Sequence, residues 1–270
     1  MKSSNIFRKI FRTALIQNFI FFSRQLIKKY RRPVKIFTNN KSYFKNKSAI
    51  EIGGPTKLFE DESKIFPIYS ELSSIDNCNY NENNFWSQLK DGDEIEFNKR
   101  EKIGKQIVAD ASDLSRIKDA SYDLLINSHV IEHIANPIKA LFEWKRVIKN
   151  DGIFVMVVPN KEFTYDNKRP VTKFEHIVED YTKGVEEDDS THFEEVIQLH
   201  DLEKDTTVKD YHDHYERTMD NFNRRIVHHH VFDTELVVKI VEFVGFEILG
   251  IQKVKPFHII VVAKNRVQNK

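Results

Sequence analysis

The chain lacks several features that would quickly assign it to a class of protein. Only one of its 270 residues is cysteine, Cys78. This excludes a disulfide framework and a multi-cysteine zinc site, and it fits a reducing compartment. No apolar run approaches the about 20 residues that cross a bilayer. No small-residue cleavage site follows the apolar letters "NFIFF" near the N-terminus, so no secretory signal is predicted. We therefore expect a cytoplasmic protein.

Acidic residues are missing from the first 50 positions, which hold thirteen lysines and arginines. Since the whole chain carries a net charge of only +1, the remainder is strongly acidic. From Ile6 to Leu26, apolar residues recur every three or four positions, as on one face of a helix. This basic amphipathic N-terminal arm, residues 1–47, has three possible roles. It packs on the protein's own surface, lies on an anionic membrane through residues 1–35, or binds nucleic acid.

After the arm, strand-like and helix-like patterns alternate. Helices are expected at about 136–149, where Pro137 comes early and "NDG" follows, and at about 233–244. Two last apolar segments, "GFEILGIQKV" and "FHIIVVAK", can pair antiparallel at a sheet edge. The alternation predicts an α/β fold with a doubly wound, Rossmann-like sheet. The other expected strands are 48–52, 73–76, 105–110, 122–129 and 152–159.

Between residues 161 and 227 the composition changes. This stretch is rich in aspartate, glutamate and histidine and nearly free of glycine, which predicts a helical lid inserted into the core. The expected domains are the arm at 1–47, a cofactor-binding core at 48–160, the lid at 161–227, and a C-terminal helix with edge strands at 228–270.

The first strand ends in an acid and two glycines, Glu51–Gly54. In open α/β sheets, ligands bind beyond the carboxyl ends of the strands, where glycine lets the backbone approach closely. Asp76 lies 25 residues after Glu51, the usual separation of an acid that holds a ribose hydroxyl, and Asp110 is placed to reach a base edge. A dinucleotide is disfavoured, because G-x-G-x-x-G is absent and Pro55 removes an N–H donor. A plain tight turn is the alternative.

The segment Asp110–Asn160 resembles the class I S-adenosylmethionine-dependent methyltransferases of the type 11 kind. The shared features are the acid after the third strand, "DLLINSHVIEH", a helix ending "RVIKNDG" and a strand ending in proline. Further motifs resemble a subgroup associated with bacterial surface-polysaccharide biosynthesis, so the resemblance covers about residues 48 to 264. These motifs are Glu51–Thr56, Asp76–Tyr80 with Trp86, Arg169–Tyr181, His228–Asp233 and Pro256–Ile259.

The resemblance implies S-adenosylmethionine as cofactor and eight positions that contact it. Pro55 and Lys57 replace the later glycines of the superfamily's E-x-G-x-G-x-G, and the subgroup shares this proline. The implied cofactor-binding residues are Glu51, Gly53, Gly54, Asp76, Asp110, Ala111, Ser128 and His129.

Methyl transfer to a hydroxyl needs alignment of the two reactants and a base that takes the proton. Histidine titrates near neutrality and suits this role. The candidate catalytic residues are His133, which follows the fourth strand, His176, which shares a helix face with Asp180, and His229 in a histidine triplet. His133 can instead cap the segment after it. Histidine and carboxylate suit several divalent ions, so a metal site among the histidines stays an alternative. Because H-E-x-x-H is absent, no metal ligands are predicted.

Together these features predict an S-adenosylmethionine-dependent methyltransferase. The expected acceptor is a sugar of a surface-glycan precursor or a nucleotide sugar, with the arm placing the enzyme at the inner face of the cell membrane. One alternative is a non-catalytic methyltransferase-fold partner of a glycosyltransferase, which would bind no cofactor. Another is a nucleic-acid methyltransferase. The acidic catalytic part and the absence of an "N-P-P-Y"-type tetrapeptide disfavour it, so no nucleic-acid partner is expected.

Overall fold

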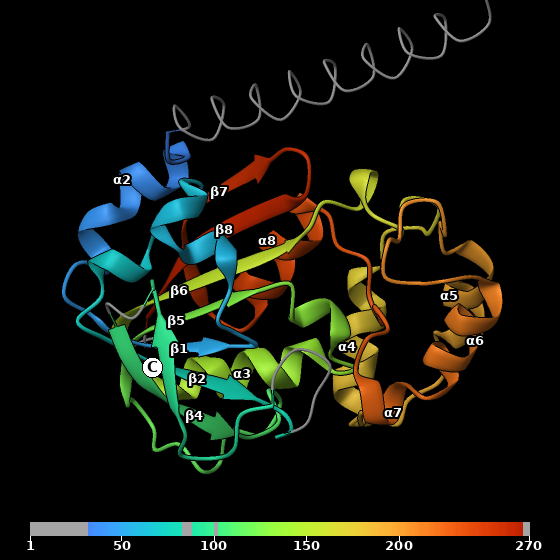
Figure 1. Cartoon of the computed structure of the whole chain (residues 1–270), viewed down its shortest axis with the longest axis horizontal. Coiled ribbons are helices and arrows are strands. Elements are labelled where there is room, and N and C mark those ends of the chain that lie inside the picture. Colours follow the sequence, from blue (N-terminus) through green and yellow to red (C-terminus); the bar gives the residue numbers. More distant parts are fainter. Residues whose placement is uncertain (1–31, 83–87, 100–101, 267–270) are drawn as a thin grey trace, which may run out of the picture.

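The computed structural model describes residues 32–82, 88–99 and 102–266. The amphipathic pattern from Ile6 to Leu26, and Trp86, lie outside these residues. Strands and helices alternate along the described part, as the sequence predicts (Figure 1). The strands are β1 (Ser48–Ile52), β2 (Ser74–Asn79), β3 (Glu94–Phe97), β4 (Lys102–Val108), β5 (Tyr122–Ser128), β6 (Ile148–Pro159), β7 (Phe246–Val254) and β8 (His258–Asn265).

The described strands form one sheet in the order β3-β4-β2-β1-β5-β6-β8-β7. The central pairs from β4 to β6 are parallel. β8 and β7 extend the sheet antiparallel at one edge, which confirms the predicted Rossmann-like fold and its C-terminal pair. β3 is an additional strand that pairs antiparallel with β4 at the other edge. Its pattern is only four residues long, with buried Ile95 and Phe97 alternating with exposed glutamates.

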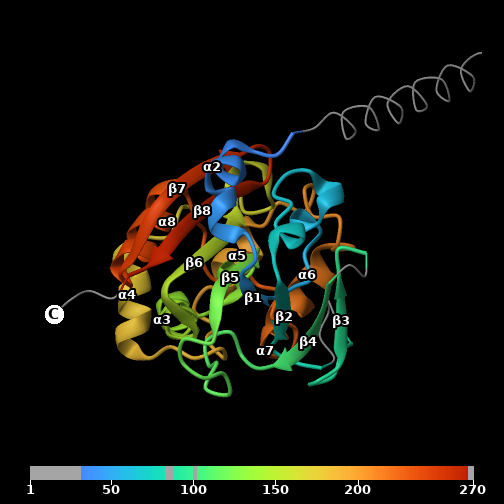
Figure 2. The same cartoon turned by 90° about the vertical axis from the view of Figure 1, so that its left-hand side faces the viewer.

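Both faces of the sheet are covered. One face packs against α3 (Pro137–Val147) and α8 (Thr234–Phe243) in an apolar cluster that includes Trp144 and Phe154. The other face packs against α2 (Lys35–Phe44) and short 3₁₀ helices between residues 57 and 71, through Phe37, Phe59 and Phe66. Covering both faces buries β6 almost throughout, as its continuous apolar run predicts. Figure 2 shows the sheet from the side of α2, which lies over β7 and β8.

α2 falls inside the arm predicted for residues 1–47. Its Ile36, Phe37 and Phe44 are buried, and the backbone N–H of Ile36 donates to the Gln252 side chain on β7 at 2.8 Å. For these residues the structure therefore shows a helix packed on the protein's own surface.

Local signals place α3 and α8. The side chain of Asn136 accepts a hydrogen bond from the backbone N–H of Lys139, and Pro137 occupies the first turn. Asp233 caps α8 in the same way, accepting from the N–H of Leu236 at 2.8 Å. The indole of Trp144 donates to the carbonyl oxygen of Ala111 at 2.9 Å, so α3 also positions the loop after β4.

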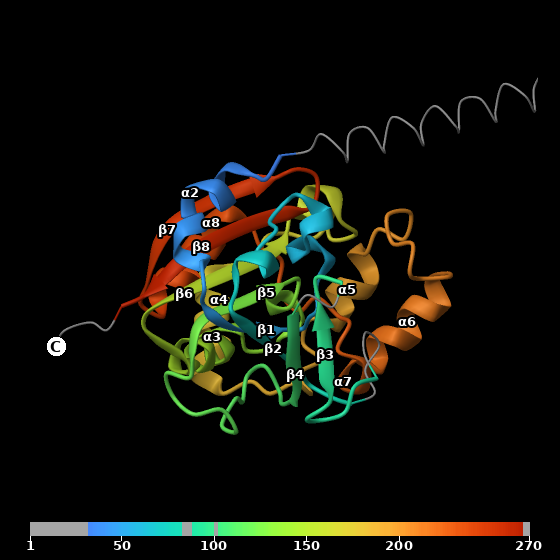
Figure 3. The same ribbon diagram turned by 60° about the vertical axis from the view of Figure 1, so that its left-hand side comes forward.

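Residues 161–227 form several helices, of which α5 and α6 lie beyond one end of the sheet (Figures 1 and 3). α4 packs against α3 and α8, and α5 packs against α6. No helix among the described residues is both long enough and apolar enough to cross a membrane. The helices of this segment are α4 (Phe174–Lys183), α5 (Phe193–Leu199), α6 (Tyr211–Met219) and α7 (Asn221–Arg224), preceded by the 3₁₀ helix η5 (Lys161–Phe163).

Candidate functional site

A cavity of the described structure opens where the strand order reverses. β1 pairs with β2 on one side and with β5 on the other, so their carboxyl ends diverge and leave a crevice, the usual ligand site of such sheets. The cavity holds about 870 Å³, within the usual range for small-molecule sites. Its core wall comes from the strand ends and its other wall from residues 164–228.

The glycine turn lies in the core wall, as predicted. Gly53 has φ +78°, and a Cβ there would lie 2.5 Å from Val130 Cγ2. A Cβ on Gly54 would lie 2.1 Å from Glu51 Cδ. Both positions therefore require glycine, and the bare backbone is left facing the cavity.

Glu51 does not line the cavity but supports the turn from beneath. It is completely buried, and its Oε2 accepts a hydrogen bond from the Tyr69 hydroxyl at 2.5 Å. Burial raises the pKa of Glu51 to about 7. The structure thus assigns Glu51 a positioning role instead of the predicted contact with the cofactor.

Asp76 is also placed differently from the prediction. The expected strand ends at residue 76, but β2 continues to Asn79, so Asp76 sits in mid-strand and does not line the cavity. Its carboxylate accepts from the backbone N–H of Lys105 and from the hydroxyl of Tyr122, both at 2.9 Å. Asn79 occupies the strand end, lines the cavity and donates to the carbonyl oxygen of Gly54 at 3.3 Å.

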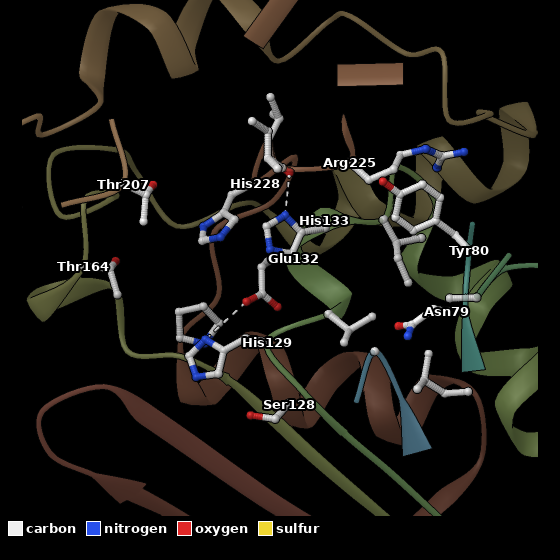
Figure 4. Close-up of a pocket in the computed structure, with 18 of the residues that line it drawn as sticks. Asn79, Tyr80, Ser128, His129, Glu132, His133, Thr164, Thr207, Arg225 and His228 are labelled. Atoms are coloured by element: carbon white, nitrogen blue, oxygen red, sulfur yellow. Dashed lines mark hydrogen bonds and ion pairs between the residues drawn. The ribbon is translucent and has the colours of Figure 1, made fainter. Parts of the chain in front are cut away.

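Asp110 and Ala111 line the cavity after β4, where the prediction places them. Asp110 Oδ1 accepts from the N–H and hydroxyl of Ser112, and its Oδ2 lies 3.3 Å from the guanidinium of Arg225. Arg225 also pairs with Glu187 and lies over the ring of Tyr80, 5.6 Å from its centroid. It therefore joins the core wall to the opposite wall. Figure 4 shows Arg225, Tyr80 and Asn79 on one side of the cavity.

Ser128 and His129 line the cavity at the end of β5. His129 has φ +57°, and its Nε2 lies 3.0 Å from Nδ1 of His258 on β8. Its Nδ1 faces Glu132 Oε1 at 3.4 Å (Figure 4). Glu132 is fully buried, and neither carboxylate oxygen has a hydrogen-bond partner of good geometry in the described structure. Burial opposes its ionisation, but the neighbouring His129, His133 and His228 lower the pKa of Glu132.

His133 reaches the cavity from η4 (Ile131–His133), with its Nδ1 3.2 Å from the carbonyl oxygen of Val227. Its ring packs edge-on against that of His228 at 4.6 Å. Burial, reinforced by the charge of His228, lowers the pKa of His133 to about 4. His133 is therefore neutral at neutral pH and lies in the cavity, as the sequence predicts for a catalytic candidate.

A chain of three polar side chains crosses the opposite wall. Nδ1 of His228 lies 2.5 Å from Asp166 Oδ2, and Nε2 lies 2.7 Å from the Tyr165 hydroxyl. Burial favours neutral His228, but the Asp166 carboxylate outweighs it and raises the pKa of His228. Burial likewise disfavours the Asp166 carboxylate, yet His228 and Arg169 lower its pKa to about 2. The pair is a candidate base with a fixed ring orientation.

The other two predicted catalytic histidines do not line the cavity. His229 is fully buried, and its ring faces Asn221 and Asp189 instead. His176 lies on α4 beside His192, with 3.2 Å between their Nε2 atoms. In the extended segment 228–230, successive side chains point in different directions, and His228 is the one that faces the cavity.

The cavity also contains residues that the sequence analysis does not select: Tyr80, Asn79, Arg225, His228, Asp166 and Tyr165. Tyr80, Asn79 and His228 lie within sequence motifs quoted above, Asp76–Tyr80 and His228–Asp233, so the sequence did contain a signal for them. Asp166 and Arg225 carry no such signal, since they reach the cavity through contacts made far along the chain.

A comparison with protein-family models supplies the chemistry of this site. Residues 75–156 match a family described as a methyltransferase domain, a segment that runs from β2 through β6. The protein is an S-adenosylmethionine-dependent methyltransferase. S-adenosylmethionine is its cofactor.

The chain is similar in structure to several methyltransferases. It matches a CurJ carbon methyltransferase at 14% identity and a TM-score of 0.42, covering 83% of this chain but only 49% of that one. A Methanosarcina mazei methyltransferase matches at 14% identity and a TM-score of 0.45, and the match covers 87% of this chain and 99% of that one. A putative Listeria monocytogenes methyltransferase matches at 12% identity and a TM-score of 0.46, and the match covers 86% of this chain and 98% of that one. No curated protein matches the chain in sequence.

The core wall fits S-adenosylmethionine. Gly53 and Gly54 leave no room for side chains, so they form a cradle for a ligand at the backbone. Asn79, Asp110 and Ser128 surround this cradle with polar groups suited to a nucleoside and an amino-acid end. The residues that would hold the cofactor are Gly53, Gly54, Asn79, Asp110, Ala111, Ser128 and His129.

Proposed function

We propose that the enzyme methylates a sugar hydroxyl on a surface-glycan precursor or nucleotide sugar. The observation that carries the proposal is the Asp166–His228–Tyr165 chain in the cavity wall opposite the glycine turn. This chain supports the proposal because it would supply a base on the side of the cavity where we expect the acceptor to bind.

S-adenosylmethionine, when bound, supplies an electrophilic methyl group. The acceptor oxygen would gain this methyl as the methyl–sulfur bond breaks and the neutral thioether leaves, and it would lose its proton, so the protein must provide a proton acceptor. His228 Nε2 is paired with the Tyr165 hydroxyl at 2.7 Å, and an acceptor hydroxyl that takes the place of Tyr165 would pass its proton to that nitrogen. Asp166 holds the Nδ1 proton of His228 and stabilises the imidazolium that forms.

The cavity wall formed by residues 164–228, which we call the acceptor wall, favours a polyhydroxylated substrate. Thr164 and Thr207 lie on the side of the cavity away from Tyr80 and Asn79, with Glu132 and His133 between them (Figure 4). Sugar hydroxyls donate and accept hydrogen bonds, and hydroxyl, carboxylate and imidazole groups pair with both functions. The buried Glu132 carboxylate, whose Oε1 faces His129 and whose two oxygens accept no hydrogen bond in the described structure, is a ready acceptor for a second hydroxyl of the substrate. Other polar residues that line this wall are His200, Asp205, His214 and Arg217.

The basic, acid-free N-terminus supports a peripheral position at the inner face of the cell membrane. Residues 1–35 would meet anionic lipid headgroups and bring the enzyme close to lipid-linked glycan intermediates. A chain without residues 1–35 is then expected to leave the membrane fraction while keeping its turnover of a free nucleotide sugar. Unchanged fractionation would remove this part of the proposal.

Cofactor binding is tested first, by calorimetric titration of S-adenosylmethionine into the full chain. We expect Gly54→Ala to abolish binding, because the added Cβ overlaps Glu51. Gly250→Ala is the matched control, since a Cβ there meets only ordinary contacts of 3.7 Å or more. A wild-type protein that is folded but binds no cofactor would favour the non-catalytic partner of a glycosyltransferase.

The acceptor is then sought with S-adenosylmethionine labelled in its methyl group. Nucleotide sugars and lipid-linked oligosaccharides are offered beside transfer RNA and duplex DNA. Label in the sugar fraction that resists mild alkali, as an ether does, would support O-methylation of a sugar. Label only in nucleic acid would overturn the proposal.

A further inference from the structure

Beside the catalytic cavity, three histidines and an aspartate from separate segments meet at one point. His176 and Asp180 lie one turn apart on α4, His192 precedes α5, and His230 lies in the segment that leads to α8. A ring nitrogen of each histidine and a carboxylate oxygen of Asp180 all lie within 4.8 Å of one another. None of the four lines the cavity described above.

We propose that these four residues, His176, Asp180, His192 and His230, form a zinc site. This departs from the sequence prediction of no metal ligands. The ligands are not at the spacing of a sequence motif, because the fold collects them from three segments.

The measured separations match a four-coordinate ion. Zinc bonds of about 2.0–2.1 Å in a tetrahedron place neighbouring ligand atoms about 3.3 Å apart. The Nε2 atoms of His176 and His192 are 3.2 Å apart, and His176 Nε2 is 3.4 Å from Asp180 Oδ2. His230 Nε2 lies 3.7 Å from the same oxygen. The remaining pairs of ligand atoms lie within 4.8 Å of one another.

Within the described structure, the proposed ligand atoms are not all satisfied by hydrogen bonds. Asp180 is buried, and its Oδ2 accepts no hydrogen bond in the described structure. A buried carboxylate oxygen without a partner costs free energy that a bound cation removes. His230 Nε2 also lies 3.1 Å from the carbonyl oxygen of Ala135, and binding through this nitrogen replaces that contact.

The donor types select the ion. Imidazole nitrogens with one carboxylate suit zinc and related divalent transition metals, whereas magnesium and calcium prefer oxygen ligands. The single cysteine is buried in β2, far along the chain from these ligands, so they are nitrogen and oxygen only.

The position of the site indicates a structural role. The ion would tie α4 and the start of α5 to the segment that carries His228, the proposed base. Val196 of α5 lines the cavity, as does His228 itself. Zinc would therefore hold the acceptor wall in place without contacting the reacting atoms.

The test is elemental analysis of the full chain, produced without a histidine tag and purified after growth with added zinc. We expect about one zinc per chain, the occupancy of a single structural site. Asp180→Asn and His192→Ala are expected to lower the zinc content at least about tenfold, the scale on which even outer partners of a metal site act. The matched control is His212→Ala, which removes an exposed ring on α6 that pairs with Glu216 at 3.2 Å and should leave the zinc content unchanged.

A second measurement, the Tm of thermal unfolding with and without zinc, does not depend on enzyme activity. It also shows whether each variant is folded. Added zinc should raise the Tm of metal-stripped wild type and of His212→Ala, but not that of Asp180→Asn. The proposal would be overturned if added zinc did not change the Tm of the zinc-free wild-type protein. Retention of zinc in Asp180→Asn with its loss in Asp189→Asn would also overturn it, placing the ion instead among Asp189, His192 and His229.

Discussion

The two walls of the cavity are built in different ways. The core wall consists of strand ends and a glycine turn, and its residues are positioned by the parallel ladder of β2, β1 and β5. The acceptor wall comes from residues 164–228, where buried ionic and imidazole groups bond to one another across long stretches of chain. Arg169 shows the second kind of construction, since it is 1% exposed and bonds to Asp166, Glu195 and the carbonyl oxygens of His228 and His229.

This difference separates binding from chemistry. A backbone cradle recognises a ligand by shape and tolerates little change, whereas a polar network tunes the charge of the groups it holds. We therefore expect substitutions in the core wall to act mainly on cofactor affinity and substitutions in the acceptor wall to act mainly on turnover and stability.

The largest effect is expected from His228→Ala, which removes the proposed base. Turnover should fall by about 10²–10⁴-fold, while the affinity for S-adenosylmethionine stays the same. Because the base acts when neutral, kcat should rise with pH through the raised pKa of His228, and Asp166→Asn should shift this rise to lower pH. Calorimetry and pH profiles of kcat measure the two parts. Loss of cofactor binding in folded His228→Ala would contradict the division between the walls.

Removal of the buried guanidinium of Arg169 should destabilise the acceptor wall. Arg169→Ala removes the buried cation that pairs with Asp166 Oδ1 and leaves His228 as the partner of Oδ2 only, so the free energy of unfolding should fall by about 3–5 kcal/mol. Its neighbour Lys168 provides the control, because its exposed ammonium pairs with Asp201 at 3.4 Å and its replacement by alanine should cost under about 1 kcal/mol. Urea unfolding measures both. Equal losses would show that the network is not buried in the way described.

Glu51→Gln sharpens the comparison from the core side. The pKa of Glu51 is raised from its ordinary value of 4.5 to about 7 in the folded protein. The protonated carboxyl therefore stabilises the fold fully below pH 4.5, and this contribution is lost as the pH rises from 4.5 to about 7. Between pH 5 and 7, wild type should lose stability relative to the glutamine variant, by at most about 1.4 kcal/mol per pH unit. The glutamine side chain keeps the bond to Tyr69. Unfolding of both proteins in urea at several pH values checks this. A difference that does not vary with pH would mean that Glu51 is ionised in the folded protein.

The smallest effect among these variants is expected at the end of β2. Asn79→Ala should weaken S-adenosylmethionine binding by about tenfold, because the amide both lines the cavity and holds the Gly54 carbonyl. Asp76→Asn should leave the affinity almost unchanged, since its carboxylate faces Lys105 and Tyr122. Titration of both variants decides whether the end of β2 or its middle meets the ligand.

Much of the sheet and of the glycine turn was predictable from the sequence. The apolar run of β6, the starts of α3 and α8, and the glycine turn all depend on neighbours within a few residues. Asp76 shows the limit of such reasoning, because the extension of β2 by three residues moves the strand end to Asn79. Strand ends depend on pairing with other strands, which short-range patterns do not reveal.

The sequence by itself determined the class of fold, the position of the glycine turn and the resemblance to methyltransferases, because hydrophobic periodicity and turn chemistry are local properties. The tertiary structure assigned the histidines. His228 faces the cavity, His229 is buried against Asn221, and His230 meets His176 and His192. These three residues are adjacent and chemically identical, so only the partners that folding brings to each one, from as far as 95 residues away, give them different roles.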